Sequence, residues 1–304
     1  MENADWKLLK LVAQTHSITQ SARQLFMSQP AATYRMQNIE REFGKKLFFI
    51  EKKRFFFTPA GEKLAEYAEE MLEKEQALKD TISNMLCGED GGTLRIGAAH
   101  MYTHFKFVPI LSDFAAAHPN IKVFVKARPS LTVMEMLNRG EVHVGIYNLD
   151  SGGFAGEKIV IAKEDISVLS NGPVDIRRLP ELPMIEHVKN HSLKSLIDDW
   201  WMNNFTVPPY ISMEVPFLGT AVEMVKRGLG YCIAPEVVLT PENKLFVTKL
   251  RDTEGKVLSR YCWLHYRPQM LEFASVRAFV NHVLTYARSS NQNPNPNSNL
   301  KPEC

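Results

Sequence analysis

Apolar and polar positions in the first 61 residues follow helical spacing three times and then give way to two short apolar runs. The three predicted helices span 5–14, 18–25 and 29–43. Ser17 and Ser28 occupy the N-cap positions of the second and third helices, and Gly44 stands where the third should end. Because only a short turn separates the second helix from the third, the segment has the spacing of a helix-turn-helix.

The third predicted helix has two different faces. Its apolar stripe, at spacings of four, three and four, comprises Ala32, Met36, Ile39 and Phe43. The opposite side is rich in hydrogen-bonding groups and comprises Gln29, Pro30, Thr33, Tyr34, Gln37, Asn38 and Arg41. Such a face suits base edges or phosphates. Any amphipathic helix also has a polar face, so an ordinary solvated helix remains an alternative.

The two apolar runs after this helix predict a β-hairpin with a charged tip. They cover 47–50 and 55–58, and the loop between them reads Glu-Lys-Lys-Arg. A basic hairpin directly after a helix-turn-helix is typical of a wing, whose cations Lys53 and Arg54 would lie against the DNA backbone or minor groove. The alternative is an exposed hairpin with solvated charges.

A long helix is predicted over 58–86, with Thr58 as N-cap and Pro59 in the first turn. Spacings of four and three define a heptad seam of Leu64, Ala68, Met71, Glu75, Leu78, Ile82 and Met85. The seam predicts a coiled-coil homodimer, although Glu75 weakens it. The alternative is a single helix packed on its own domain.

Beyond a predicted hinge at 88–92, strand and helix patterns alternate as far as residue 288. The predicted strands are 93–98, 123–127, 142–147, 165–169, 211–215, 231–234 and 261–266. The predicted helices are 104–118, 132–139, 193–205, 219–226 and 271–287. This order favours a parallel sheet, in which ligands bind beyond the carboxyl ends of the strands. Residues 289–304 are rich in Asn, Pro and Ser and are predicted to be a disordered tail.

The order of motifs resembles that of the LysR-type transcriptional regulators. In the first 61 residues the resemblance lies in SITQSARQL (17–25), MSQPAAT (27–33), IE (39–40), FG (43–44), LF (47–48) and TPAG (58–61). Further along it lies in LRIG (94–97), LNRGEVHVGI (137–146) and VKRGLGYCIAP (225–235). It covers about residues 5–288, which leaves only the tail outside.

The resemblance implies a fold class, a domain order and a function. It implies an N-terminal winged helix-turn-helix over 1–61, a dimerising linker helix over 58–87, and an α/β two-lobed effector domain over 93–288 that is similar to the type II periplasmic binding proteins. Lobe I would cover about 93–162 and 268–288, and lobe II about 163–267. The partners implied are double-stranded promoter DNA, a small-molecule effector between the lobes, and copies of the same chain in a homodimer or homotetramer.

Several side chains fall at positions that contact DNA in this family, and two depart from the usual pattern. The candidates on the third helix are Ser28, Gln29, Pro30, Thr33, Tyr34 and Gln37, with Arg41 on the same face and Lys53 and Arg54 in the wing. Tyr34 stands where a basic or polar residue is usual, and Ile50 replaces a common Arg. Both departures prevent a transfer of operator sequence to this chain.

The effector candidates lie at predicted strand ends and helix starts, where they should face one cleft. They are His100, Thr103, Ser130, Tyr147, Phe217 and Thr220. Hydroxyls and free N–H groups at helix N-termini suit a carboxylate, so an anionic organic or amino acid is expected. For each of these residues, a simple cap or core role is the alternative.

Composition and charge narrow the remaining classes. A chain of 304 residues that is 45% hydrophobic and 23% charged is neither disordered, collagen-like nor a disulfide scaffold, and no apolar run has the length of a membrane span. The net charge of +2 divides into +5 for residues 1–61 and −3 for the rest. The basic end is a candidate phosphate-binding surface. We expect a cytoplasmic protein without a cofactor.

Other chemistry has little support in the sequence. The four cysteines lack metal-ligand spacing, and GxSxG, P-loop and GxGxxG signatures are absent, so no catalytic residue is predicted. The pairs His100/His104 and His187/His191 could each share a helix face and hold a metal, but no acidic partner accompanies them, and no metal site is predicted. A solute-binding transport component would match residues 92–288 and leave the head unexplained. A purely structural coiled-coil protein would need no cleft.

Overall fold

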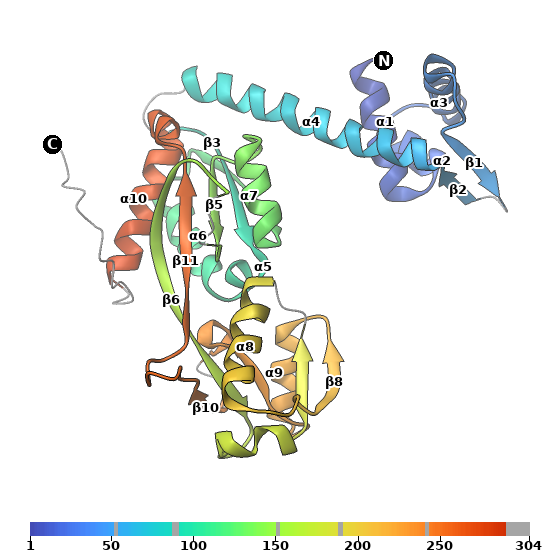
Figure 1. Cartoon of the computed structure of the whole chain (residues 1–304). Helices are drawn as coiled ribbons and strands as arrows, with labels where there is room; N and C mark the ends of the chain where they lie inside the picture. Colours follow the sequence, from blue (N-terminus) through green and yellow to red (C-terminus); the bar gives the residue numbers. More distant parts are fainter. Residues whose placement is uncertain (52–53, 87–90, 150–152, 188–190, 241–242, 290–304) are drawn as a thin grey trace. The chain divides into compact units, whose positions relative to one another are not determined.

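The computed structural model describes residues 1–51, 54–86, 91–149, 153–187, 191–240 and 243–289. It divides into two compact units, Met1–Ser83 and the chain from Asn84 onward (Figure 1). Residues 290–304 of the predicted tail and most of the predicted hinge lie outside the described residues, as do Lys53, Cys87 and Cys304, whereas Ser289, predicted to begin the tail, ends a helix.

The first unit is a helical head with a hairpin and a long helix. Its elements are α1 (Asn3–Thr15), α2 (Ile18–Gln24), α3 (Gln29–Phe43), β1 (Phe48–Glu51), β2 (Arg54–Phe57) and α4 (Pro59–Leu86), of which the last three residues belong to the second unit. The Ser17 hydroxyl accepts from the backbone N–H of Gln20, and the Ser28 hydroxyl accepts from that of Ala31. Gly44 ends α3 with φ +61°, a conformation that glycine adopts without a Cβ penalty. The predicted caps are therefore confirmed.

The head core shows how far the predicted apolar stripes hold. Ala32, Met36 and Ile39 of α3 are fully buried with side chains from α1, α2 and β2. Phe43 is exposed instead, because α3 ends there and the chain turns away at Gly44, so its inclusion in the stripe is corrected.

The residues of the predicted heptad seam in α4 differ in burial between the two halves of the helix. Leu64 and Ala68 belong to the head core and are not free to form a coiled coil. Leu78, Ile82 and Met85, in the second half of the helix, are exposed.

The second unit has two lobes that share two long strands. Lobe I contains β3 (Gly92–Ala99), α5 (His100–Tyr102), a π-helical turn (Thr103–Phe107), α6 (Val108–Ala117), β4 (Ile121–Arg128), α7 (Ser130–Asn138), β5 (Val144–Tyr147) and α10 (Ala274–Ser289). Lobe II contains β7 (Met184–His187), α8 (His191–Asn204), β8 (Ile211–Val215), α9 (Leu218–Lys226), β9 (Cys232–Pro235) and β10 (Phe246–Lys249). The shared strands are β6 (Glu157–Ser170) and β11 (Ser259–Tyr266).

The central sheet is mixed and not purely parallel. Its order is β10-β6-β11-β5-β3-β4, and β9 also pairs with β6. Strands β3, β4 and β5 are parallel, as the βαβαβ pattern predicts, whereas β11 runs antiparallel to both β5 and β6. The carboxyl ends of β3, β4 and β5 therefore share one edge, from which α5 and α7 begin.

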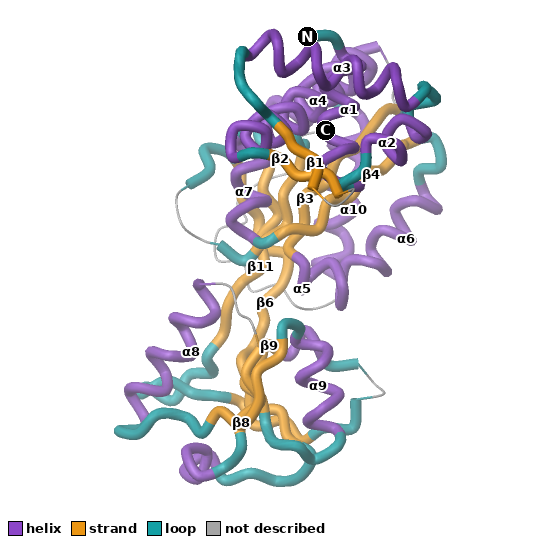
Figure 2. The backbone as a smooth tube through the Cα atoms, turned by 90° about the vertical axis from the view of Figure 1, so that its right-hand side faces the viewer, coloured by secondary structure: helices purple, strands orange, loops and turns teal. Residues whose placement is uncertain are grey.

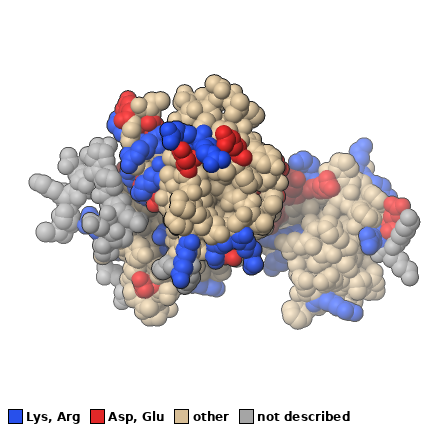
Figure 3. All heavy atoms as spheres, turned by 90° about the horizontal axis from the view of Figure 1, so that it is seen from below, with Lys and Arg blue, Asp and Glu red and all other residues tan. Residues whose placement is uncertain are grey.

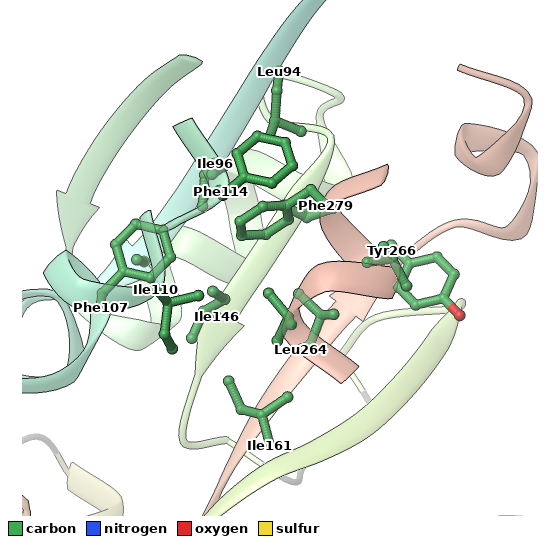
Figure 4. Packing of buried hydrophobic residues seen from close by; sticks show 14 of the residues in the cluster. Leu94, Ile96, Phe107, Ile110, Phe114, Ile146, Ile161, Leu264, Tyr266 and Phe279 are labelled. Atoms are coloured by element: carbon green, nitrogen blue, oxygen red, sulfur yellow. The ribbon is translucent and has the colours of Figure 1, made fainter. Parts of the chain in front are cut away.

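The core of lobe I packs α6 and α10 on this sheet (Figure 4). The ring of Phe279 from α10 stands edge-on to that of Phe114 from α6, with ring centres 5.2 Å apart. Ile96, Ile146 and Leu264, from three neighbouring strands, lie among the fully buried side chains of the same cluster. Lobe I thus has a tightly packed core between its sheet and the helices α6 and α10.

Strands β6 and β11 run from one lobe into the other in both ribbon views (Figures 1 and 2). β6 pairs with β11 as far as Asp165, and from Ile166 onward it pairs with β9 and β10 of lobe II. The change of partner between these two residues marks the crossing point between the lobes.

The charged side chains on the face of the molecule seen from below are of both signs (Figure 3). Lys and Arg lie close to Asp and Glu there, on an otherwise uncharged surface. Exposed ion pairs also occur at a 3-10 helix (Ile176–Glu181) in lobe II, where Arg177–Asp175 measures 2.8 Å and Arg178–Glu181 measures 3.1 Å. Exposed pairs of this type contribute little to stability.

Candidate functional site

The outer face of α3 carries most of the predicted DNA-contacting side chains in an accessible position. Ser28, Gln29, Pro30, Tyr34, Gln37 and Arg41 are exposed, and Thr33 is half-buried. The amide Nε2 of Gln29 donates to the Thr33 hydroxyl at 2.9 Å, one turn along the helix. The structure thus places these seven candidates along one side of one helix.

Tyr34 and Arg41 lie next to each other on this face. The Arg41 guanidinium lies 5.7 Å from the centre of the Tyr34 ring and also donates to the side chain of Asn38. Hydrogen bonds with Asn38 and Arg41 lower the pKa of the Tyr34 hydroxyl. An aromatic ring with a cation against it can stack on a sugar or base and still present donors to phosphate.

Arg35 is not part of this face. Its guanidinium donates to Asp5 at 2.7 Å and to Glu2 at 3.1 Å, both at the start of α1. These bonds link the start of α1 to α3.

The β1–β2 hairpin, which connects α3 to α4, has an inner and an outer side. On the inner side, Phe55 is buried in the head core and stacks on Phe48 with ring centres 5.1 Å apart. On the outer side, Phe49 and Phe56 pair across the strands with ring centres 5.5 Å apart and are exposed. Arg54 is exposed at the tip opposite Glu51, and Lys53 lies outside the described residues.

A cleft of about 850 Å³ lies between the lobes of the second unit. Lobe I contributes the start of α5 and of α7, and lobe II contributes the start of α9. Four predicted effector residues line it: His100, Ser130, Phe217 and Thr220. They come together because strands of the central sheet end at this edge and helices begin there.

Two predicted effector residues do not line the cleft, which corrects the expectation that they face it. The Thr103 hydroxyl donates back to the carbonyl of Ala99 at 3.0 Å within the helical turn. Tyr147 is buried in lobe I, and its ring stacks on His265 with centres 4.0 Å apart. The alternation of side chains along β5 directs Tyr147 into the core and leaves its neighbour Asn148 on the cleft.

Sequence reasoning missed the polar group at the base of the cleft. Arg260 of β11 and Asn148 line the cleft, and both also line a second cavity of about 430 Å³. The Arg260 Nε donates to Glu164 at 2.6 Å, and the Asn148 amide donates to the same carboxylate at 3.4 Å. A signal was present, because Arg260 and Glu164 are charges within otherwise apolar strand patterns.

The described residues of the predicted histidine pairs and the cysteines were also candidates for a metal site. His187 ends β7 and His191 begins α8, so the predicted pair does not share one helix, which corrects that suggestion. Among the described residues, no group of three or more His, Cys, Asp or Glu could hold a metal ion. Cys232 and Cys262 are buried in different core clusters, and burial raises the pKa of the Cys262 thiol.

A winged helix-turn-helix head followed by a two-lobed unit with an interlobe cleft defines a class of transcriptional regulators, and comparison with known families identifies it. Residues 4–62 match the bacterial regulatory helix-turn-helix of the LysR family, and residues 88–288 match the LysR substrate binding domain. The chain belongs to the LysR family of DNA-binding transcriptional regulators.

Individual relatives extend over nearly the whole chain. The uncharacterized HTH-type transcriptional regulator YraN of Bacillus subtilis (strain 168) is 39% identical over 283 residues, which are 93% of this chain and 97% of the relative. The regulator IlvY of Escherichia coli (strain K12) is 26% identical over 271 residues, 83% of this chain and 89% of the relative.

Solved structures share the fold. The crystal structure of CbnR, a LysR family transcriptional regulator, matches with a TM-score of 0.69 at 19% identity and covers 94% of this chain and 99% of its own. CbnR complexed with its target DNA matches with a TM-score of 0.68 at 20% identity and the same coverage. Separately, none of the described helices of this chain has the length and apolarity to cross a bilayer.

Proposed function

We propose that this chain binds promoter DNA through the outer face of α3 and the tip of the β1–β2 hairpin, and that a small molecule in the interlobe cleft changes this binding. The observation that supports it most is the row of exposed hydrogen-bonding side chains on α3, on the side opposite the buried Ala32, Met36 and Ile39. A helix held in this way presents its side chains to the major groove without cost to the core.

Each segment of the chain has its own task. Residues 1–61 bind DNA, residues 58–87 pair two chains through α4, and residues 93–288 hold the effector. The exposed apolar residues in the second half of α4 support the pairing, since water-exposed Leu, Ile and Met gain by covering one another. Pairing of dimers into a tetramer and action in the cytoplasm, on chromosomal DNA, belong to the same proposal, as does the absence of enzymatic activity.

The proposed DNA binding is tested by an electrophoretic mobility shift assay with the full chain and the DNA upstream of its own gene. Gln29→Ala should weaken binding and lose sequence preference, because an amide can read base edges. Arg54→Ala should weaken binding to all sequences alike and lessen its salt dependence, because a tip cation contacts phosphate. Arg177→Ala, in lobe II, is the matched control and should change neither. If Gln29→Ala binds every site as the wild type does, the assigned orientation of α3 is wrong.

A solute-binding transport component is the rival that shares the two-lobed fold. The head argues against it, because a carrier has no use for an exposed row of Gln, Thr, Tyr and Arg on a capped helix. A complete lack of DNA complexes at low salt would favour the rival.

A further inference from the structure

The strongest unexplained feature of the effector unit is the buried ion pair between Arg260 and Glu164 at the base of the cleft. Only 8% of the Arg260 side chain and 3% of the Glu164 side chain are exposed. The two residues face each other across β11 and β6, one position before β6 changes partner between the lobes. A buried pair is costly to desolvate, so its presence at the crossing point calls for an explanation.

The guanidinium is only partly used by the protein. Its Nε donates to Glu164, and its Nη2 contacts the Sδ of Met101 at 3.1 Å. Within the described part of the chain its Nη1 has no hydrogen-bond partner. An arginine offers five N–H donors in a planar fork, and Arg260 lines the cleft, so it has donors left for a second anion there.

A buried hydroxyl on the same cleft has the same property. Ser130 is 4% exposed, stands at the first position of α7, and its hydroxyl has no partner among the described residues. The backbone N–H groups at the start of that nine-residue helix add a positive potential there. The two groups converge on one cleft and both favour an acceptor that carries negative charge.

The remaining walls are mostly apolar. They include Met101, Phe105, Phe217 and Leu218. A ligand that fits them needs an apolar body. The carboxylate of Glu164 leaves the Arg260 site with no net charge, so a single negative charge is accommodated better than two.

We propose, on the basis of the function proposed above, that the effector of this chain is a monocarboxylate with an apolar body, and that Arg260 is the residue that binds its carboxylate. Because Arg260 lies where β6 and β11 cross between the lobes, its bond to the carboxylate would attach the ligand to these strands. Any movement of one lobe relative to the other would occur about the same strands. Glu164 orients the guanidinium from behind, and the Asn148 amide holds Glu164.

The test measures binding of matched acids and amides to the full chain by calorimetry. The probes are hexanoate with hexanamide, phenylacetate with phenylacetamide, and longer pairs of the same two series at concentrations up to millimolar. The wild type should prefer at least one acid over its amide by about tenfold or more, since a charge-assisted bond is about twice as strong as a neutral one.

Variants of the ion pair separate ligand binding from structural support. Arg260→Gln alone leaves Glu164 buried without its cation, so the double variant Glu164→Gln, Arg260→Gln is the main reagent, because it keeps the site neutral and hydrogen-bonded. It should lose the preference for the acid. Glu164→Gln alone retains the guanidinium and should bind the acid as well as or more tightly than the wild type.

Other results overturn the inference. If both single variants lose stability alike and every variant keeps the wild-type ratio of acid to amide affinity, the pair is structural only. If amides or amines bind and no acid does, the cleft is an effector site and the carboxylate assignment alone fails. If no compound of either kind binds, this inference fails together with the effector arm of the proposed function. Mobility shifts with each variant report on the DNA arm independently.

Discussion

The exposed apolar row on α4 gives a quantitative prediction for dimer formation. Leu78, Ile82 and Met85 are 59%, 50% and 70% exposed in the single chain. Full burial of such a side chain contributes about 1.5–3 kcal/mol, so covering the exposed half contributes about 1 kcal/mol. Leu78→Ser with Ile82→Ser removes two such side chains from each of two helices. The loss is about 4 kcal/mol, or a dimer about 1000-fold weaker.

Sedimentation equilibrium over a range of protein concentrations measures this loss. The double variant should become monomeric at concentrations where the wild type is a dimer, and its helix content should be unchanged. Lys79→Ser is the control, because Lys79 follows Leu78 in sequence but is not part of the apolar row. It removes only an exposed ion pair with Glu75, one helical turn earlier, and should leave the dimer intact. If the double variant dissociates at the same concentration as the wild type, α4 does not pair through this row.

Three further predictions concern stability and the effector response. Phe26, in the turn before α3, is 99% exposed and has φ +54°. Phe26→Asn should raise the free energy of unfolding of the head, measured with urea, by about 0.5–1 kcal/mol, because Asn adopts positive φ more readily. A lower free energy of unfolding would show that the Phe26 ring stabilises the head. Phe279→Ala should lower the free energy of unfolding of lobe I by about 3–5 kcal/mol, because it leaves a cavity against Phe114. In the same denaturation series, Phe124→Ala on the edge strand β4 should lower it by less than about 1 kcal/mol. Equal losses would contradict the assignment of Phe279 to the core. Ser130→Trp should fill the cleft and abolish any ligand-induced change in DNA affinity while the unliganded affinity stays at the wild-type value, and a retained response would place the effector elsewhere.

Local signals in the sequence were sufficient for the head. Ser17, Ser28 and Gly44 cap backbone groups that lie within one helical turn of them. The helix ends that they define therefore do not depend on the rest of the fold. Phe43 shows the limit of periodicity, because its burial depends on which element covers the end of α3. Leu64 shows the same limit, since a heptad pattern cannot distinguish a partner helix from the chain's own core.

The effector cleft depends on long-range pairing that local patterns do not contain. His100 and Ser130 could be placed because the ends of parallel strands share one edge of a sheet. Arg260 could not, because its position at the cleft follows from the antiparallel register of β11 on β6, a pairing between segments almost a hundred residues apart. Tyr147 was misplaced by a single step of strand alternation, which moves a side chain from the cleft to the core.

If the function proposed above holds, this protein reads DNA sequence through α3. Fluorescence anisotropy with the full chain, its labelled upstream DNA and a scrambled duplex of equal length tests it most directly at physiological salt. Binding to the upstream DNA should be about 1000-fold tighter or more, as specific regulators show. Equal affinity for the two duplexes would show that α3 does not read the sequence.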